Sequence, residues 1–482
     1  MKSPLRNLGD LLHAYKDVHS DIVEIDHENF NQRCFTTHQL ETTAQSTAWY
    51  LQTKGYGPED RIAIVADNCL ESIVCYLAVL KLGGIVVMIS YKATLTQISN
   101  MLQDSKVKLV LTDLVIDSDI PVINFSQISA HWVDTPDFDS HVPDEKDTAV
   151  ILHTSGSTGN PHRVLITHQA RLNMLANTHS PGTRGNATLL FANPLYHSMG
   201  MNLLDLSLYN KRDLCFLKKF DPIVYLKTID QLRPAGLVGV PSMFSLLVTH
   251  KDLIRTLDLS SVRNITLSGG STTPSLYAQL KQTFENANIR IAYGSTELGP
   301  SVFGSHKTLP TPAMSVGCEQ QGILYRLADK ILQVKSPLMM KGYDNQTGSF
   351  THDGYYITND QFEVDQDGFY YFLGRSDDMF KSGGNKIFPS EIERVVEQHP
   401  AIDKCVAVPI SDPVKEFKPY AFVTLKPGAA TTPEEIMIFL QDNLARYQMP
   451  RQIWILDNMP LSTVNKIDKQ RLIILAGQQL NT

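Results

Sequence analysis

Residues 153–161 read His-Thr-Ser-Gly-Ser-Thr-Gly-Asn-Pro and directly follow a short apolar run, Ala-Val-Ile-Leu, at residues 149–152. An apolar run of this length that leads into glycines and hydroxyl residues is typical of a buried strand followed by a loop. The crowded hydroxyls and glycines provide small donors and backbone N–H groups that can surround an anion. No Gly-Lys-Ser/Thr follows Gly156 at the required spacing, which excludes the common P-loop. Alone, the stretch also fits an ordinary flexible loop.

Similar apolar runs recur along the chain, usually with longer amphipathic segments between them. They lie at residues 61–65, 85–89, 107–111, 188–191, 237–240, 265–267 and 289–292. Strands that are apolar on both faces and alternate with helices predict parallel α/β layers. The expected fold is therefore α/β, with a large multi-layer N-terminal domain of mostly parallel, buried sheets.

The character of the sequence changes after about Gly342. Asp-Gly turns separate short aromatic strands such as residues 369–373, and strand-like runs follow at residues 405–408 and 421–425. Two capping patterns mark helix starts: Ser390 with Glu393, and Thr432-Pro433 with Glu435. We expect a small α+β domain of roughly a hundred residues here.

Composition limits the compartment and the partners. The 482 residues carry 43 basic and 50 acidic side chains, a net charge of −7, which disfavours nucleic acid as a partner. Six scattered cysteines without a C-x-x-C pair indicate buried, reduced thiols rather than a disulfide framework. The most apolar stretch, residues 73–89, is broken by Lys81 and Gly83-Gly84, so it predicts a helix and a strand rather than a membrane span. With no signal-peptide pattern at the start, we expect a cytoplasmic protein with no integral membrane segment.

Four further polar stretches follow the loop of residues 153–161. They are Tyr293-Gly-Ser-Thr-Glu297, Thr358-Asn-Asp360, residues 374–393 and residues 460–468. On chemistry alone, tyrosine can stack on a purine, glutamate is a hard ligand for Mg²⁺ and aspartate can bond a diol. Each stretch also has an ordinary reading, such as a strand-to-helix turn or a surface lysine.

In this order, the five stretches resemble the adenylate-forming superfamily of acyl- and aryl-CoA synthetases, peptide-synthetase adenylation domains and firefly luciferase. Weaker matches at residues 194–200, 240–244, 267–272 and 340–343 extend the resemblance over most of the chain. It implies an AMP-forming acid–thiol ligase that uses ATP and Mg²⁺. Such a ligase forms an acyl-adenylate, releases pyrophosphate and transfers the acyl group to a pantetheine thiol. The alternatives are a catalytically silent adenylate-binding paralogue and a luciferase-like oxygenase.

The resemblance also implies roles for individual residues. The phosphate loop would comprise Thr154, Ser155, Gly156, Ser157, Thr158 and Gly159. Ser271, Tyr293 and Gly294 would line the adenine slot, and Asp360 and Arg375 would bind the ribose hydroxyls. Thr296 would contact the α-phosphate, Glu297 would hold Mg²⁺, and Lys466 would reach the carboxylate and the α-phosphate.

Domain rotation between the two steps is a further implication of the resemblance. The hinge matches Asp377, which divides the chain into an ATP- and carboxylate-binding domain, residues 1–376, and a mobile domain, residues 377–482. Rotation would withdraw Lys466 and bring in Lys381, Gly383 and Gly384. The two glycines would let the thiol approach closely because they lack side chains.

Three positions depart from the family pattern. His162-Arg163 stands where Lys-Gly is usual, so we expect weaker binding of MgATP unless Arg163 restores the charge. Asn465 and Asn359 each replace a glycine. Asparagine tolerates positive φ better than most residues, so both changes are expected to be mild.

The segment after Pro194 gives the remaining information about the acid. Residues 196–202 contain no acidic side chain, and the first acid is Asp205, so an uncharged fatty or aromatic tail is favoured over an amino acid. His197 and Gly270 are candidates for the acyl pocket. The chain ends at Thr482 with no carrier domain, so we expect the thiol in trans, from CoA or from the phosphopantetheine of a carrier protein. The sequence favours neither a particular acid nor an oligomeric state.

Overall fold

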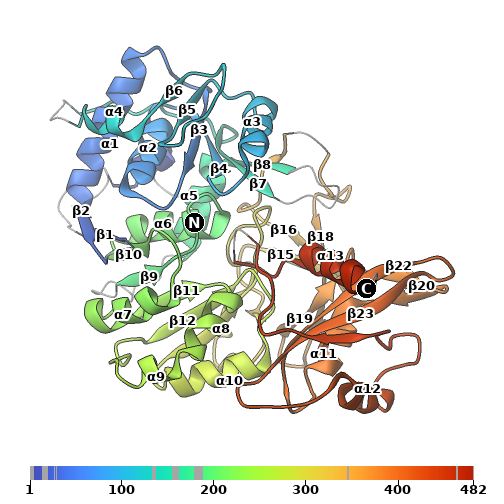
Figure 1. The fold of residues 1–482 in the computed structure, drawn as a ribbon. Coiled ribbons are helices and arrows are strands. Elements are labelled where there is room, and N and C mark those ends of the chain that lie inside the picture. The colour runs from blue at the N-terminus through green and yellow to red at the C-terminus, as the bar shows by residue number, and fades with distance from the viewer. Residues whose placement is uncertain are drawn as a thin grey trace.

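The structure is a computed structural model that describes residues 5–12, 20–26, 28, 30–132, 137–154, 162–178, 188–344, 347–462 and 465–480 (Figure 1). Its strands form four sheets within these residues. The first three sheets come from residues before 376, and the fourth from residues 380–455.

The first sheet has the order β17-β8-β7-β4-β3-β5-β6. Its central strands are parallel, whereas β8 runs antiparallel to β7 and β17 pairs antiparallel with β8. The strands are β3 (Arg61–Ala66), β4 (Ile85–Ser90), β5 (Leu109–Leu111), β6 (Val122–Ile123), β7 (Thr148–Thr154), β8 (His162–Thr167) and β17 (Gly342–Tyr343). The helices of this part are η1 (Leu8–Asp10), α1 (Thr37–Thr53), α2 (Leu70–Lys81), α3 (Leu95–Asp104), α4 (Phe125–Ser129) and α5 (His168–Thr178).

The second sheet has the order β13-β12-β11-β9-β10-β1-β2, and only its edge strand β2 is antiparallel within the described residues. The strands are β1 (Asp21–Ile25), β2 (Gln32–Thr36), β9 (Leu189–Phe191), β10 (Leu214–Leu217), β11 (Gly236–Gly239), β12 (Asn264–Ser268) and β13 (Asn288–Ala292). The accompanying helices are α6 (Ser198–Asn210), α7 (Pro222–Leu232), α8 (Pro241–Thr249), α9 (Lys251–Ile254) and α10 (Pro274–Thr283). Every apolar run named from the sequence is a strand in one of these two sheets, which confirms the predicted α/β class.

The third sheet is antiparallel, with the order β14-β19-β18-β16-β15. The strands are β14 (Gly317–Cys318), β15 (Leu324–Ala328), β16 (Ile331–Lys335), β18 (Tyr356–Val364) and β19 (Phe369–Arg375). The change in sequence character after about Gly342 therefore does not mark the boundary of the small domain. This sheet starts earlier, and Leu332, Val334 and Phe362 belong to the main hydrophobic core of the N-terminal part.

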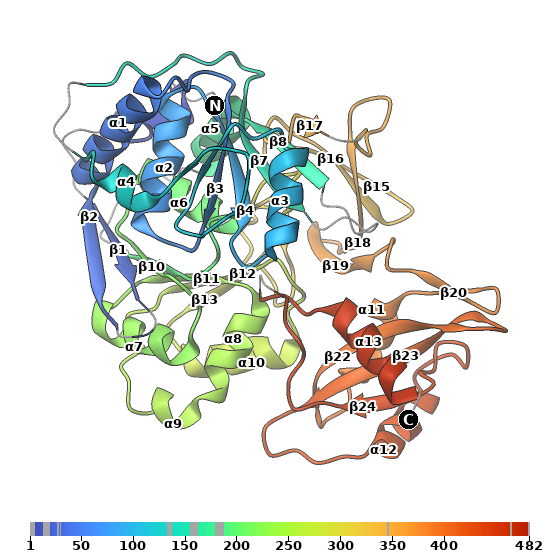
Figure 2. The same ribbon diagram turned by 45° about the horizontal axis from the view of Figure 1, so that its top comes forward.

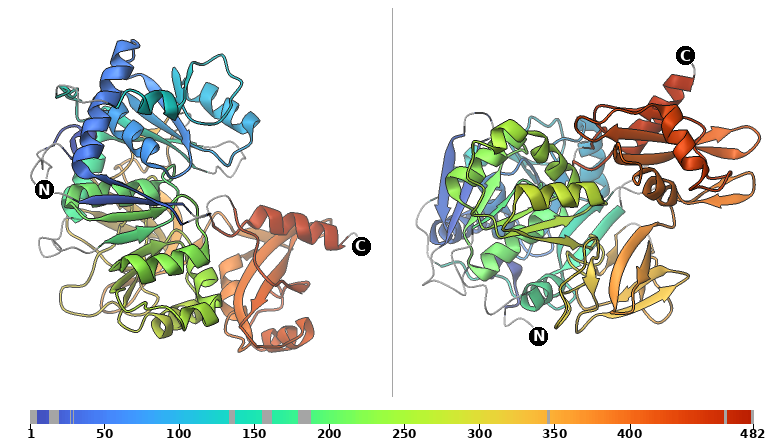
Figure 3. Two further views of the ribbon diagram at one scale, coloured as in Figure 1. Left: turned by 60° about the vertical axis from the view of Figure 1, so that its left-hand side comes forward. Right: turned by 90° about the horizontal axis from the view of Figure 1, so that it is seen from below.

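The fourth sheet and its helices form a small α+β unit with hydrophobic clusters of its own. The elements are β20 (Phe380–Ser382), β21 (Asn385–Ile387), α11 (Pro389–Val396), β22 (Ile402–Asp412), β23 (Glu416–Leu425), α12 (Pro433–Gln441), β24 (Ile453–Ile455) and α13 (Lys469–Leu480). In Figures 1 and 3 this orange-to-red unit stands beside the green layer. Residues 376–379 link it to β19, so one short connection joins the two parts at this point.

The two predicted helix caps have different outcomes. Thr432 and Glu435 form a capping box at α12 with Pro433 in the first turn, as predicted. At α11 the prediction is wrong, because Phe388 occupies the N-cap position and Ser390 is already helical. The Glu393 carboxylate instead accepts a hydrogen bond from the backbone N–H of Ala407, 3.0 Å away. A tertiary partner has replaced the local one.

Other sequence predictions concern cysteines and membrane spans. All six cysteines are free and five are buried, whereas Cys34 is exposed, contrary to the expectation of burial. Residues 73–89 form the end of α2 and most of β4, as predicted. Among the described residues, none of the helices has the length and apolarity needed to cross a membrane.

Candidate functional site

A cleft of about 3010 Å³ lies at the carboxyl ends of the parallel strands. Open α/β sheets bind ligands at this edge because loops from several strands converge there. Thr154 ends β7, His197 follows β9, Ser271 follows β12 and Tyr293 follows β13, and all four line the cleft. Lys466 of the C-terminal unit lines the same cleft, so residues far apart in the sequence share one site.

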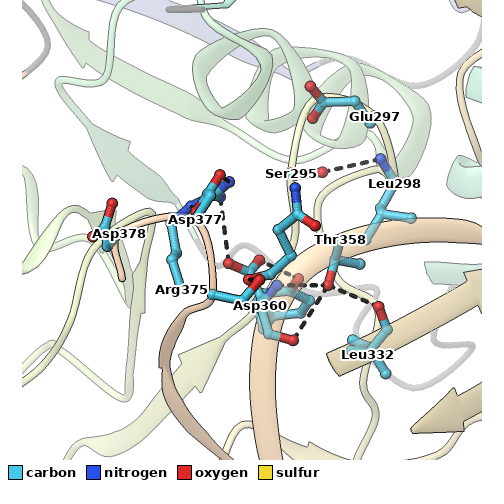
Figure 4. A network of polar contacts seen from close by, with 12 residues as sticks. Ser295, Glu297, Leu298, Leu332, Thr358, Asp360, Arg375, Asp377 and Asp378 are labelled. Atoms are coloured by element: carbon cyan, nitrogen blue, oxygen red, sulfur yellow. Dashed lines mark hydrogen bonds and ion pairs between the residues drawn. The ribbon is translucent and has the colours of Figure 1, made fainter. Parts of the chain in front are cut away.

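Asp360 and Arg375 (Figure 4) form a polar network in this cleft together with Tyr293. The Tyr293 hydroxyl donates to Asp360 Oδ2 at 2.5 Å, and Arg375 Nη1 donates to Asp360 Oδ1 at 3.3 Å. Asp360 and Arg375 are register partners on β18 and β19, which holds them side by side. Burial raises the pKa of Asp360 to about 6, although Arg375 and Tyr293 act in the opposite direction. Both carboxylate oxygens thus face hydrogen-bond donors.

The predicted hinge residue is tied to the same network. Arg375 donates to both oxygens of Asp377, from Nε at 2.7 Å and from Nη2 at 2.5 Å. This fork raises the pKa of the Arg375 guanidinium, against the effect of its burial. The next residue, Asp378, accepts from Lys469 Nζ at 2.6 Å. The link between the two parts is therefore fixed by charged hydrogen bonds on both sides of the predicted pivot.

Thr296 and Glu297 lie in the turn after β13. The Thr296 hydroxyl donates to Ser198 Oγ at 3.2 Å, and Tyr343 donates to Glu297 Oε1 at 3.0 Å. The backbone N–H of Met340 donates to the Glu297 carbonyl at 2.8 Å. The Glu297 carboxylate is thereby held at the cleft, and carboxylate oxygens are the ligands that Mg²⁺ prefers.

Lys466 reaches this cleft from a tight turn in the C-terminal unit. The turn is closed by hydrogen bonds between Ser462 and Lys466, and Ser242 Oγ donates to the carbonyl of Asn465. A Cβ placed on Gly269 would lie 3.4 Å from Lys466 Cε, so the lysine stem passes close to the loop after β12. The side chain keeps contact with solvent in the open cleft. Desolvation by the surrounding protein nevertheless lowers its pKa, and Glu297 opposes this effect.

The two asparagines that replace family glycines have the conformation that explains the exchange. Asn359 has φ +61° and Asn465 has φ +58°. Both lie in the left-handed region, where asparagine is favoured among residues with a side chain. The expectation that both replacements are mild agrees with this geometry.

His197 precedes helix α6 and lines the cleft. Its Nε2 is buried and has no hydrogen-bond partner among the described residues. Burial and the charge of Lys466 lower the pKa of His197 to about 4. The imidazole is therefore neutral at pH 7.

The part of the cleft next to His197 is lined by residues of both helix α6 and the second sheet. On β11 and β12, alternate side chains are buried against α7, α8 and α10, and the residues between them are partly open and line the cleft. We call this space the helix–sheet channel and define it by Val238, Thr266 and Ser268 on the sheet and Met199, Leu203 and Leu206 on α6. Met199, Leu203 and Leu206 recur at helical spacing, so one face of α6 forms a wall.

Gly270, Ser271 and Gly294 of the predicted site occupy their positions for different structural reasons. Gly270 and Ser271 are exposed in the loop after β12 and line the cleft. Gly294 is required by packing, because a Cβ there would overlap the carbonyl of Gly299.

The predicted thiolation residues lie outside the cleft. Lys381, Gly383 and Gly384 form the β20–β21 hairpin and its turn, and none lines the cleft. Gly383 and Gly384 have φ +54° and +83°, conformations that glycine adopts without cost. The structure brings Lys466 to the site and leaves this hairpin away from it.

Of the predicted phosphate loop, the structure describes only Thr154. Ser155, Gly156, Ser157, Thr158 and Gly159 lie outside the described residues, whereas Thr154 lines the cleft. His162 also lines the cleft, with its ring 5.4 Å from that of Tyr343. Arg163 instead pairs with Asp344, Nε to Oδ2 3.2 Å. That Arg163 restores the missing lysine charge stays a prediction, and its ion pair with Asp344 argues against it.

Two functional features were missed by the sequence reading. Tyr343 lies in the weaker motif at residues 340–343, but nothing in the sequence predicted its hydrogen bond to Glu297. Asp205 was noted only as the first acid after Pro194. It is fully buried and paired with Arg171, and Tyr76 donates to it at 3.1 Å. No local pattern indicates this pair, since Arg171 lies 34 residues away on another helix.

Comparisons with known proteins agree with this geometry. The family model of the AMP-binding enzyme matches residues 16–344, and that of the AMP-binding enzyme C-terminal domain matches residues 391–466. A long-chain-fatty-acid–CoA ligase of Bacillus subtilis is 28% identical and covers 92% of this chain and 90% of its own. A 2-succinylbenzoate–CoA ligase of Geobacillus sp. is 27% identical and covers 91% and 92%. ATP-bound MatB from Rhodopseudomonas palustris has a TM-score of 0.85 at 21% identity, over 100% of both chains.

The MatB likeness shows a shared fold. The first family model alone covers more than half of the chain, and the resemblance read from the sequence motifs is confirmed. The chain belongs to the AMP-binding enzyme family.

Proposed function

We propose that the protein is an acid–thiol ligase that activates a carboxylic acid with ATP and passes the acyl group to CoA. The observation that carries the proposal is the meeting of Lys466, Glu297 and the Tyr293–Asp360–Arg375 network in one cleft. These groups come from the second and third sheets and from the C-terminal unit. A structural role alone would not require their convergence.

Each group has a chemical task in the first step. Asp360 and Arg375 bind the ribose hydroxyls, with Tyr293 beside the adenine. Thr296 contacts the α-phosphate, and Lys466 stabilises the negative charge that develops as the carboxylate attacks and pyrophosphate leaves. Preorganised charges of this kind are the main source of catalysis in phosphoryl-type transfers. Glu297 would hold Mg²⁺, whose charge offsets that of the phosphates.

For the second step we propose rotation of residues 377–482 against residues 1–376 about Asp377. The interface between the two parts supports this proposal because, among the described residues, few polar contacts cross it. They include Ser275 to Asp403 at 3.0 Å and Ser242 to the Asn465 carbonyl. Rotation would break them, remove Lys466 and present Lys381, Gly383 and Gly384 to the acyl-adenylate.

The acid is proposed to be fatty or aromatic rather than an amino acid. Asp205, the acid that could pair with a substrate ammonium, is buried against Arg171. The helix–sheet channel supplies apolar walls from Met199, Leu203 and Leu206. The names of the two ligases above, for a long-chain fatty acid and for 2-succinylbenzoate, support the same class.

The test is carboxylate-dependent ATP–pyrophosphate exchange without thiol, over short, medium, long-chain, aryl and amino acids. Exchange with fatty or aryl acids is expected, and exchange confined to amino acids would contradict the proposed acid class. A folded protein that binds ATP but exchanges with no acid would support the silent paralogue. Thioester formation with CoA, compared with carrier-protein phosphopantetheine, then decides the acceptor.

A further inference from the structure

The far end of the helix–sheet channel carries positive charge. Arg212 follows α6 and precedes β10, whose first residue, Leu214, pairs with Leu189 at the start of β9. His197 follows the other end of β9, so the two side chains lie at opposite ends of the channel. Helix α6 between them has 13 residues, which corresponds to about 20 Å. Arg212 and His197 line the same cleft.

Arg212 has no counter-charge in the described part of the chain. Its guanidinium makes no ion pair and no side-chain hydrogen bond there, and its Nε is buried without a partner. Burial alone lowers its pKa. Arg212 as a whole is only partly buried, but a buried polar atom such as its Nε normally has a partner in a native protein. An unpaired guanidinium that lines a ligand cleft therefore points to a ligand group.

The wall of the helix–sheet channel also carries positive charge. Arg290 of β13 shares the channel face of the sheet, because it is paired in register with Thr266. Its Nη2 donates to Ser301 Oγ at 2.9 Å and to the Phe303 carbonyl at 2.8 Å, and burial lowers its pKa. No described acidic residue pairs with it. Every acidic side chain that lines the cleft lies at position 297 or later, on the nucleotide side or in the C-terminal unit.

We propose that the far end of the helix–sheet channel binds a second anionic group of the acid substrate, a carboxylate, through Arg212. Arginine is suited to this because its fork matches a carboxylate with two parallel hydrogen bonds. Arg290 adds positive potential along the wall. The inference rests on the proposed function and narrows its substrate class to acids with an apolar middle and a second carboxylate. It differs from the uncharged tail expected from the sequence.

The test compares matched acids of equal length. Binding of α,ω-dicarboxylic acids, from adipic to hexadecanedioic acid, is measured by calorimetry against the corresponding monocarboxylic acids and ω-hydroxy acids. One diacid length should bind at least about tenfold more tightly than its monoacid, as expected for a hydrogen-bonded charge pair. The ω-hydroxy acid should not reproduce this gain, because it carries no charge.

Variants assign the effect to the channel. Arg212→Met should reduce the diacid-to-monoacid affinity ratio about ten- to hundredfold, Arg212→Lys should retain part of it, and Arg290→Met should reduce it less. The matched control is Arg255→Met, since that side chain is 75% exposed and lies outside the cleft; it should leave the ratio unchanged. Thermal melting of each variant reports folding.

The outcomes separate this inference from the proposed function. Diacid preference lost in Arg212→Met supports the inference even if ATP–pyrophosphate exchange is absent, in which case the ligase proposal alone fails. No diacid preference at any length, or a preference that neither arginine variant changes, overturns the inference while exchange with monoacids would leave the ligase proposal intact.

Discussion

Asp360 gives the most quantitative prediction, because its carboxyl is both the proposed ribose ligand and a group with a displaced pKa. Burial raises that pKa from 3.8 to about 6 in the folded protein. Ionisation of the folded state is therefore disfavoured, and Asp360 lowers stability as pH rises through the interval from about 4 to 6. Ribose hydroxyls are donors, so nucleoside binding favours the ionised form and opposes this effect.

The expected size follows from the ionised fraction. With a pKa of about 6, roughly one-tenth of Asp360 is ionised at pH 5 and roughly nine-tenths at pH 7. Adenosine should therefore bind about tenfold more tightly at pH 7 than at pH 5, a difference of about 1.4 kcal/mol. Adenosine is chosen because it lacks phosphates, so Lys466 contributes less to its pH dependence.

The assay is isothermal calorimetry at pH 5 to 8 in two buffers of different ionisation enthalpy. At pH 6, binding should release about half a proton, and at pH 8 almost none. Asp360→Asn should bind more weakly and without proton release, and 2′,3′-dideoxyadenosine should show no pH dependence in the wild type. Affinity that is constant from pH 5 to 7, or that rises on acidification, would refute the role of Asp360 as an ionised ribose ligand.

The remaining predictions concern Lys466, His162 and the two asparagines. Lys466→Ala should reduce ATP–pyrophosphate exchange at least about a hundredfold yet spare thioester formation from preformed acyl-adenylate; equal loss of both would contradict the rotation. His162→Lys should lower the KM for ATP, because a permanent cation then lines the cleft beside Tyr343; an unchanged KM would show that no charge is missing. Asn465→Ala should destabilise the Lys466 turn by about 1 kcal/mol and slow exchange, whereas Asn465→Gly should not, because φ is +58° there. Asn359→Ala should weaken ATP binding more than Asn359→Gly, because φ is +61° at this position. Equal weakening by both variants would show that the asparagine side chain matters rather than the backbone conformation.

The sequence alone was sufficient wherever the deciding interactions are local. Apolar runs that end in glycine or polar residues became the parallel strands of two sheets, and Thr432 with Glu435 became the cap of α12. The motif order identified the family, which the family models confirm. Strand burial, capping and left-handed backbone depend on neighbours within a few residues, so one sequence carries them.

Tertiary structure decided every feature that depends on distant partners. Arg163 pairs with Asp344, and the two residues are 181 positions apart. Asp205 is taken by Arg171, and Glu393 caps no local turn because it bonds Ala407. The positive charge of the helix–sheet channel could not be predicted either, because the sequence does not distinguish Arg212 from an arginine on the surface. Whether a charged side chain is paired, buried or left facing a ligand is set by packing between distant segments, and no local spacing encodes that.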